Sequence, residues 1–170
     1  MLPVNFTPGP SQLYFTVPDH VRKAFKEGIP SLSHRSKQFE SIFKEATEGL
    51  RNLLNLPADY HIFFTGSATE IWERIIQNLT ELHSAHLING AFSKRFYETA
   101  VQLNKKPLKI TANEGEGFSQ DIIVPQETEI LAVTQNETST GVSIPVEFIY
   151  KWRQKHPDIL IVVDAVSSLP

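Results

Sequence analysis

The sequence contains no cysteine, and this absence excludes several kinds of chemistry at once. Disulfide bonds, thiolate zinc sites and cysteine nucleophiles all require that residue. The first residues also lack the basic stretch and the apolar segment of a signal peptide. No apolar run approaches the length that crosses a membrane. We therefore expect a cytoplasmic protein that does not enter the membrane.

A large excess of charge is lacking as well. The 170 residues include 16 Lys and Arg and 19 Asp and Glu, which gives a formal net charge of −3 and a pI near 6.1. Such a surface does not favour nucleic acid or an anionic membrane as a partner. With 41% hydrophobic residues, the chain has enough apolar mass for one globular core.

Several ligand motifs are missing too. No G-x-x-x-x-G-K-[ST] segment occurs, and no G-x-G-x-x-G segment follows a predicted strand, so nucleotide-binding folds lose their main support. The segment around Ser67 reads TGSAT and not G-x-S-x-G, which excludes the nucleophile turn of α/β-hydrolases. His83 and His86 lack a third ligand, so no metal site is expected.

The apolar pattern that is present predicts an α/β fold. Residues 1–15 are rich in proline and predict an irregular N-terminal arm, before a helix over 16–28 and a long amphipathic helix over 39–54. Further strands are predicted at 61–64, 85–89, 106–111, 129–135 and 159–163, with helices at 72–79, 93–103 and 145–157. This alternation predicts an open, mostly parallel sheet with helices on both faces.

Four loops follow predicted strands of this sheet: TGSAT, NGAF, QNETSTG and DAVSS. The carboxyl ends of parallel strands meet at one edge, and ligands of such sheets bind there. We therefore expect the four loops to line one pocket. They would bring to it backbone N–H groups, an aromatic ring, hydroxyls and a carboxylate.

Two of these loops offer a charged or anion-binding group, each with a second explanation. Asp164 ends an unbroken apolar run that predicts a strand buried on both faces. A carboxylate there needs a positive or hydrogen-bonding partner, so it either binds a ligand or caps a following helix. TGSAT opens a helix whose N–H groups favour an anion, although Ser67 and Glu70 also have the spacing of a plain capping box.

Other candidates have alternatives of the same kind. Phe92 either stacks on a planar ligand or packs in the core. Thr138 and the two hydroxyl residues after it either bind a ligand or tie down their own turn. Arg35, beside His34 in a polar segment, either pairs with a carboxylate or phosphate or is simply exposed.

Six segments in order, TPGPS, SHRS, TGSAT, NGAF, NETSTG and VVDAVSS, resemble the class V aminotransferases, which are pyridoxal-phosphate enzymes of fold type I. The resemblance covers nearly the whole chain. Within the class, SHRSKQFE followed by LLNLPADYHIFF is most similar to phosphoserine aminotransferases. The implied reaction transfers an amino group from O-phosphoserine to 2-oxoglutarate. NETSTGV and VVDAVSSL also resemble alanine–glyoxylate and serine–pyruvate aminotransferases, which gives the alternative reaction.

The resemblance also implies roles in cofactor binding. Asp164 meets the protonated pyridine nitrogen of pyridoxal phosphate and is the catalytic residue of this chain. Ala68 and Thr69 hold the cofactor phosphate, and Thr138 hydrogen-bonds the cofactor. Phe92 takes the stacking position where phosphoserine aminotransferases usually carry tryptophan.

For the substrates, a small amino acid and a 2-oxo acid, the resemblance implies that Arg35 holds an acidic group with His34 beside it. It also implies a homodimer. The family's Schiff-base lysine follows the aspartate after another strand, and the sequence ends at Pro170. We therefore expect residues 16–170 to be the N-terminal part of the cofactor-binding large domain and expect no transamination by them alone. The alternative is a catalytically inactive fragment that keeps the phosphate loop and Asp164.

Overall fold

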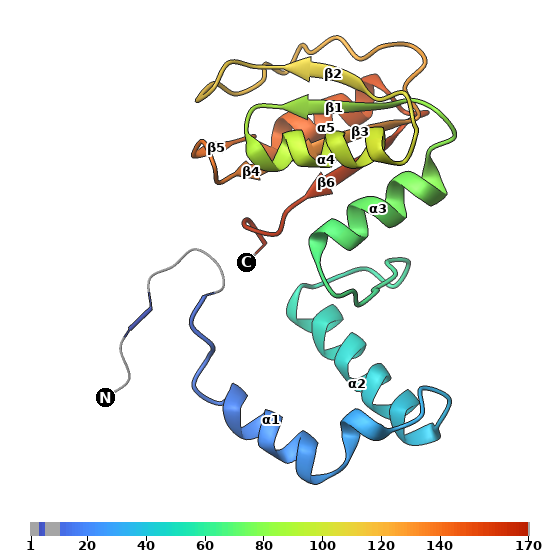
Figure 1. Ribbon diagram of the computed structural model, residues 1–170, viewed down its shortest axis with the longest axis vertical. Coiled ribbons are helices and arrows are strands. Elements are labelled where there is room, and N and C mark those ends of the chain that lie inside the picture. Colours follow the sequence, from blue (N-terminus) through green and yellow to red (C-terminus); the bar gives the residue numbers. More distant parts are fainter. Residues whose placement is uncertain (1–3, 6–10, 170) are drawn as a thin grey trace. The chain divides into compact units, whose positions relative to one another are not determined.

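In the computed structural model, the chain divides into two compact units, one within residues 1–63 and the other within residues 64–170. The structure describes residues 4–5 and 11–169, and Figure 1 labels their helices and strands. Most of the expected N-terminal arm therefore lies outside the described residues. That residues 16–170 belong to one large domain stays a prediction. No helix in the described part of the chain is long and apolar enough to cross a membrane.

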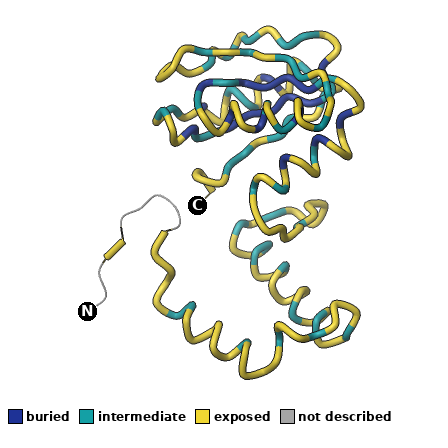
Figure 2. Tube along the Cα trace, viewed as in Figure 1, coloured by how far each residue is buried: buried dark blue, intermediate teal, exposed yellow. Residues whose placement is uncertain are grey.

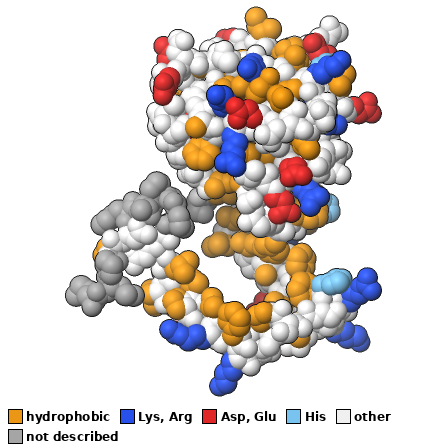
Figure 3. Space-filling view, in the orientation of Figure 1, with side chains coloured by type: hydrophobic (Ala, Val, Ile, Leu, Met, Phe, Trp, Pro, Cys, Tyr) orange, Lys and Arg blue, Asp and Glu red, His pale blue; other side chains and the backbone are white. Residues whose placement is uncertain are grey.

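The first unit consists of amphipathic helices. They are α1 (Val17–Lys26), the short 3-10 helix η1 (Ile29–Ser31) and α2 (Lys37–Leu53). Ser36 begins α2 as its cap, since its side chain accepts a hydrogen bond of 3.1 Å from the N–H of Phe39. Both longer helices are confirmed, α2 from its apolar spacing and α1 from the proline and the acidic residue at its start, although the side chain of Thr16 caps nothing there. Neither helix buries a residue (Figure 2), and apolar side chains are exposed along both helices (Figure 3). Leu53 is one of these exposed residues.

The second unit is built around a four-stranded parallel sheet. Its strands, in spatial order, are β2 (Leu108–Thr111), β1 (Ser84–Ile88), β3 (Ile130–Thr134) and β6 (Leu160–Asp164). A separate antiparallel hairpin consists of β4 (Asn136–Glu137) and β5 (Val142–Ser143). The arrowheads of β1 and β2 point toward the side where this hairpin lies (Figure 1). The hairpin therefore marks the edge at which the strands end.

Helices cover both faces of this sheet. They are α3 (Ala68–Leu79), α4 (Ala91–Gln102) and α5 (Val146–Lys155). Trp72 of α3 and Phe96 of α4 pack in one core, and Trp152 of α5 packs in the other. Adjacent residues of β3 alternate between the two cores, with Ala132 in the first and Leu131 in the second, as side chains of a strand do. The expected parallel sheet with helices on both faces is confirmed.

Two details differ from the predicted strands. Residues 61–64 form no strand among the described residues, because no neighbouring strand offers them backbone partners. Residues 159–163 do supply β6, but within the described residues this strand has a neighbour on one side only and is not buried on both faces. Leu160 is 48% exposed and Val163 is 40% exposed. An apolar run therefore predicts that a strand forms, but it does not predict which elements pack against its two faces.

His86 is buried in β1, and its Nδ1 atom has no hydrogen-bond partner among the described residues. Its Nε2 atom lies 2.8 Å from Oγ of Ser84, and its ring meets the rings of Phe96 and Tyr97 edge-on. Burial lowers the pKa of His86 from 6.5 to about 4, because the charged imidazolium loses its hydration there.

Acid should therefore destabilise the second unit through His86. The unfolded chain takes up this proton near pH 6.5 and the folded chain only near pH 4, so the stability is complete above pH 6.5 and is lost as the pH falls toward 4. Between about pH 7.5 and about pH 5, this group should remove about 2 kcal/mol from the free energy of unfolding. Urea unfolding followed by tryptophan fluorescence measures the loss. His86→Gln should flatten the pH dependence and His83→Gln should not; equal slopes in all three proteins would contradict the prediction.

Candidate functional site

A cleft of about 180 Å³ lies in the second unit where the strands end. It is lined by Ala68, Thr69, Trp72, Phe92, Arg95, Thr134, Asn136, Thr138, Asp164, Val166 and Ser167. All four predicted loops contribute to this lining, as expected. The five residues expected to hold a cofactor, namely Ala68, Thr69, Phe92, Thr138 and Asp164, are brought together in it.

The amino end of α3 presents hydrogen-bond donors at this cleft. Ser67 caps the helix by accepting a bond of 3.2 Å from the N–H of Glu70, and the Glu70 carboxylate accepts one of 3.0 Å from the N–H of Gly66. The N–H groups of Ala68 and Thr69 make no hydrogen bond within the described residues, because the first N–H groups of a helix have no partner inside it. The capping interaction therefore leaves two donors available for an anion.

Arg95, in the first half of α4, adds a positive charge to the lining. Its guanidinium pairs with no carboxylate in the described part of the chain. Sequence reasoning did not identify this residue. Its spacing from Phe92 could have identified it as a cleft residue. Arg95 follows Phe92 by three positions, and residues so spaced share one face of a helix.

Asp164 ends β6 beside Thr134 of β3. Its Oδ1 atom accepts a hydrogen bond of 3.2 Å from the N–H of Val166, and no helix follows it among the described residues. The carboxylate therefore secures the turn that follows β6. An ionised carboxylate can accept about four hydrogen bonds, so Asp164 retains capacity for a positively charged or N–H ligand.

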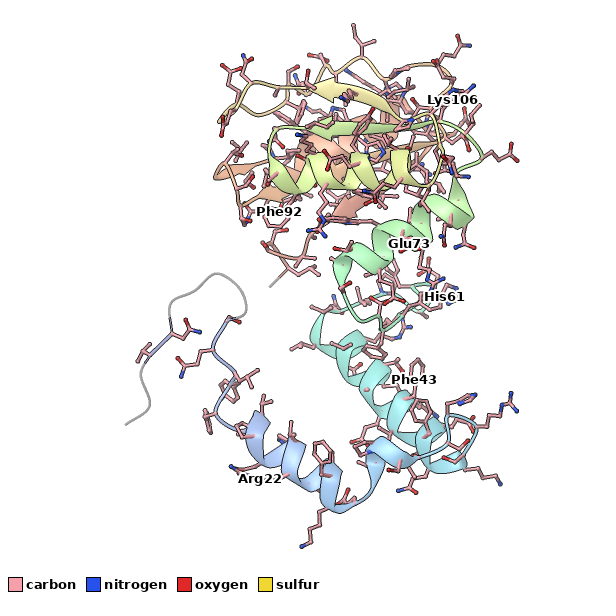
Figure 4. All side chains as sticks on the ribbon, in the orientation of Figure 1. Arg22, Phe43, His61, Glu73, Phe92 and Lys106 are labelled. Atoms are coloured by element: carbon pink, nitrogen blue, oxygen red, sulfur yellow. The ribbon has the colours of Figure 1, made fainter. Side chains whose placement is uncertain are left out.

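Aromatic side chains supply the apolar part of the lining. Phe92 is 46% exposed at the start of α4, so the core-packing alternative is wrong (Figure 4). Trp72 is almost fully buried and stacks on Phe96, with the ring centroids 5.1 Å apart. Trp72 thus anchors the wall of the cleft to the core while Phe92 stays available to a ligand.

A model of the family described as "Aminotransferase class-V" matches residues 4–170. The chain belongs to this family. It is similar to a phosphoserine aminotransferase from Corynebacterium glutamicum, with 33% identity over 155 residues, which cover 85% of this chain and 40% of the relative. A crystal structure of a phosphoserine aminotransferase from Cytophaga hutchinsonii shares 55% identity and superposes with a TM-score of 0.93 over 98% of this chain and 46% of that one.

A third relative shares the fold at lower identity. The PLP-bound phosphoserine aminotransferase from Trichomonas vaginalis is 23% identical with a TM-score of 0.69, over 82% of this chain and 46% of that one. The class V aminotransferase chain described here thus spans less than half the length of each of these relatives.

Besides Arg95 and Ser167, the polar residues Thr134 and Asn136 of the cleft were not predicted from the sequence. Thr134, the last residue of β3, is 4% exposed, and its hydroxyl makes no hydrogen bond within the described residues. Leaving a buried hydroxyl without a partner is costly, so Thr134 is an unsatisfied polar group beside the cleft. Asn136 is already engaged, because its Nδ2 atom donates a bond of 3.1 Å to the carbonyl of Ser167. The place of Thr134 near the end of a predicted strand could have identified it as a residue of the site.

Buried Glu137 joins the β4–β5 hairpin to the start of α4. Its carboxylate accepts hydrogen bonds from the N–H groups of Phe92 (3.3 Å) and Ser93 (2.8 Å) and from the hydroxyls of Ser93 (2.8 Å) and Ser139 (2.6 Å). Desolvation raises the pKa of Glu137, but these hydrogen bonds outweigh it and hold the pKa below its usual range.

Beside Glu137, Thr138 is exposed at the cleft and makes no hydrogen bond within the described residues. Ser139 therefore ties down the loop, and Thr138 is left for a ligand.

The expected substrate residues belong to the first unit. His34 and Arg35 are exposed in the segment before α2, and the N–H of Arg35 donates a hydrogen bond of 3.2 Å to Oγ of Ser33. The five expected cofactor residues all lie within the second unit. The substrate-binding role of His34 and Arg35 stays a prediction.

Gly90, the residue before α4, should tolerate no side chain. A Cβ atom there would lie 2.4 Å from Cγ of Glu137 and 2.6 Å from Oγ of Ser139. Gly90→Ala should lower the free energy of unfolding by about 1–3 kcal/mol, the usual cost of overpacking. The control is Gly49→Ala in α2, which meets no atom within 4 Å and should raise it by about 0.5–1 kcal/mol. Urea midpoints compare the two, and an unchanged midpoint for Gly90→Ala would show that the contact is easily relieved.

Proposed function

We propose that this chain belongs to a pyridoxal-phosphate-dependent aminotransferase that acts on O-phosphoserine and 2-oxoglutarate. The observation that carries the proposal is the composition of the cleft. It combines the partly satisfied carboxylate of Asp164 with the donors of Ala68, Thr69 and Arg95. A planar ligand with an anionic group and a protonated ring nitrogen matches such a lining.

The residues present fit pyridoxal phosphate on further grounds. The N–H groups of Ala68 and Thr69, with the guanidinium of Arg95, would hold the phosphate, since helix amino ends and arginine both favour it. Phe92 would lie against the pyridine ring.

When bound, pyridoxal phosphate would supply an electron sink for the transfer of the amino group. Asp164 would hold the proton on the ring nitrogen, since a carboxylate nearby favours the charged form of a base. Phe92 would cover one side of the ring, and Thr138 would offer its hydroxyl as a hydrogen-bond partner.

The substrate is proposed from the relatives and from charge. Both the Corynebacterium glutamicum and the Cytophaga hutchinsonii relatives are named phosphoserine aminotransferases. A phosphorylated substrate and glutamate each carry an acidic group beyond the amino acid core, which a fixed arginine can bind. Arg35 is the proposed arginine, with His34 beside it. The alternative, alanine–glyoxylate or serine–pyruvate transamination, is favoured by Phe92 and the segment NETSTGV.

Replacing Asp164 tests the cofactor assignment in the protein that contains this chain. Asp164→Asn should weaken pyridoxal phosphate binding about tenfold to a hundredfold, since a charge-assisted hydrogen bond contributes about 1.5–3 kcal/mol. Equilibrium dialysis measures the affinity without any need for turnover. The control is Asp158→Asn, an exposed aspartate before β6 that should not affect affinity. Equal affinity of the Asp164→Asn and wild-type proteins would end this assignment.

Replacing Arg35 tests the substrate assignment. Arg35→Ala should lower kcat/KM for O-phosphoserine at least about tenfold more than for alanine, because alanine has no second acidic group to lose its contact. Arg22→Ala, which removes an exposed arginine of α1, is the control. A wild-type preference for alanine with glyoxylate would favour the alternative reaction and leave the aminotransferase proposal intact.

We also infer a cytoplasmic homodimer, which is what the family resemblance implies. Light scattering of the protein that contains this chain reports its mass in solution.

A further inference from the structure

Glu137 lies behind the cleft and not in its lining, yet its neighbours on both sides of the chain, Asn136 and Thr138, line it. The carboxylate accepts five hydrogen bonds, from the N–H and hydroxyl groups of Ser93 and of Ser139 and from the N–H of Phe92. Ser93 and Phe92 begin α4, whereas Ser139 follows β4. One buried group therefore links the two segments that carry Phe92 and Thr138.

This link leaves no free space around the carboxylate. Gly90 passes so close that a Cβ atom would meet Cδ of Glu137 at 2.5 Å. The N–H of Ala91 donates a hydrogen bond of 2.8 Å to Oγ of Ser139, which adds a second tie between the same segments. The hydroxyl of Thr140 adds a third, through a bond of 3.1 Å to the carbonyl of Asn89. The start of α4 and the hairpin can therefore shift only together.

The negative charge is needed for this arrangement. A carboxylate offers two acceptor oxygens, and each oxygen of Glu137 faces at least one backbone N–H group, which can only donate. A glutamine of the same shape would replace one oxygen with an NH₂ group, which would point donors at donors. The carboxylate also complements the positive amino end of α4.

We propose that Glu137 is a positioning residue of the cofactor site, which sets Phe92 and Thr138 at the spacing that the bound ring requires. This inference rests on the proposed function. Glu137 touches no ligand itself and acts through the two segments that it joins.

A second carboxylate provides a matched control. Glu129 accepts hydrogen bonds from the N–H groups of Glu81, Leu82 and His83 and so ties together two segments at the other end of the strands. Those hydrogen bonds hold the pKa of Glu129 below its usual range although desolvation raises it, as at Glu137. None of these residues lines the cleft. Glu129→Gln should therefore lower stability without changing cofactor affinity.

The test measures pyridoxal phosphate affinity by equilibrium dialysis in the protein that contains this chain. Glu137→Gln should weaken binding about tenfold, whereas Glu129→Gln should leave it unchanged although urea unfolds both variants more easily. Phe92→Leu should weaken binding in the wild type but have little further effect in Glu137→Gln, because Phe92 is then already displaced. Ser139→Ala removes one of the five donors to Glu137 and should weaken cofactor binding by a smaller factor. This variant replaces Glu137→Gln in the test if Glu137→Gln does not fold.

The outcomes separate this inference from the proposed function. Wild-type affinity in both Glu137→Gln and Ser139→Ala would overturn the positioning role while leaving the cofactor assignment intact. Fully additive effects of Glu137→Gln and Phe92→Leu would also overturn it, since independent sites add and coupled ones do not. A wild-type protein with no affinity for pyridoxal phosphate would overturn both.

Discussion

The parallel alignment of β1, β3 and β6 is the constraint on which the site depends. Because all three strands run in one direction, the segments that leave them emerge at the same edge. The register pairs Thr134 with Asp164, so that the last residues of two strands lie side by side. An antiparallel neighbour would have carried one of these residues to the opposite edge. The position of the cleft is therefore determined by the direction of the strands and not by any one side chain.

Much of this fold could be predicted from sequence, because its main signals are local. The proline and acid at its start predicted α1, apolar spacing predicted α2, and the alternation of patterns indicated a parallel sheet. The differences concern contacts that are not local. Within the described residues, 61–64 have no strand to pair with, and β6 has a neighbouring strand on one side only. The chain spans less than half the length of its relatives, so these two segments carry the strand signal without their full set of neighbours.

The site was predicted in part for a similar reason. Asp164, Phe92 and Thr138 follow strands, and family resemblance gave them roles that the residues alone left open. Arg95 was missed because an arginine on a helix usually means an exposed surface. Glu137 was missed because nothing near it in the chain shows that Ser93, more than forty positions earlier, donates to its carboxylate. Only the folded chain distinguishes this carboxylate, which is saturated with donors, from that of Asp164, which is not.

The unpaired donors at the start of α3, which are proposed to bind an anion, belong to the backbone of Ala68 and Thr69. Backbone N–H groups are present whatever side chain a residue carries, proline excepted. Mutation can therefore change these two positions over evolutionary time without removing the donors, provided that Ser67 or an equivalent cap keeps the helix start in place. Homologous proteins can therefore differ in sequence at these two positions and still keep both backbone donors. Sequence identity at these positions then underestimates how well the donors are retained.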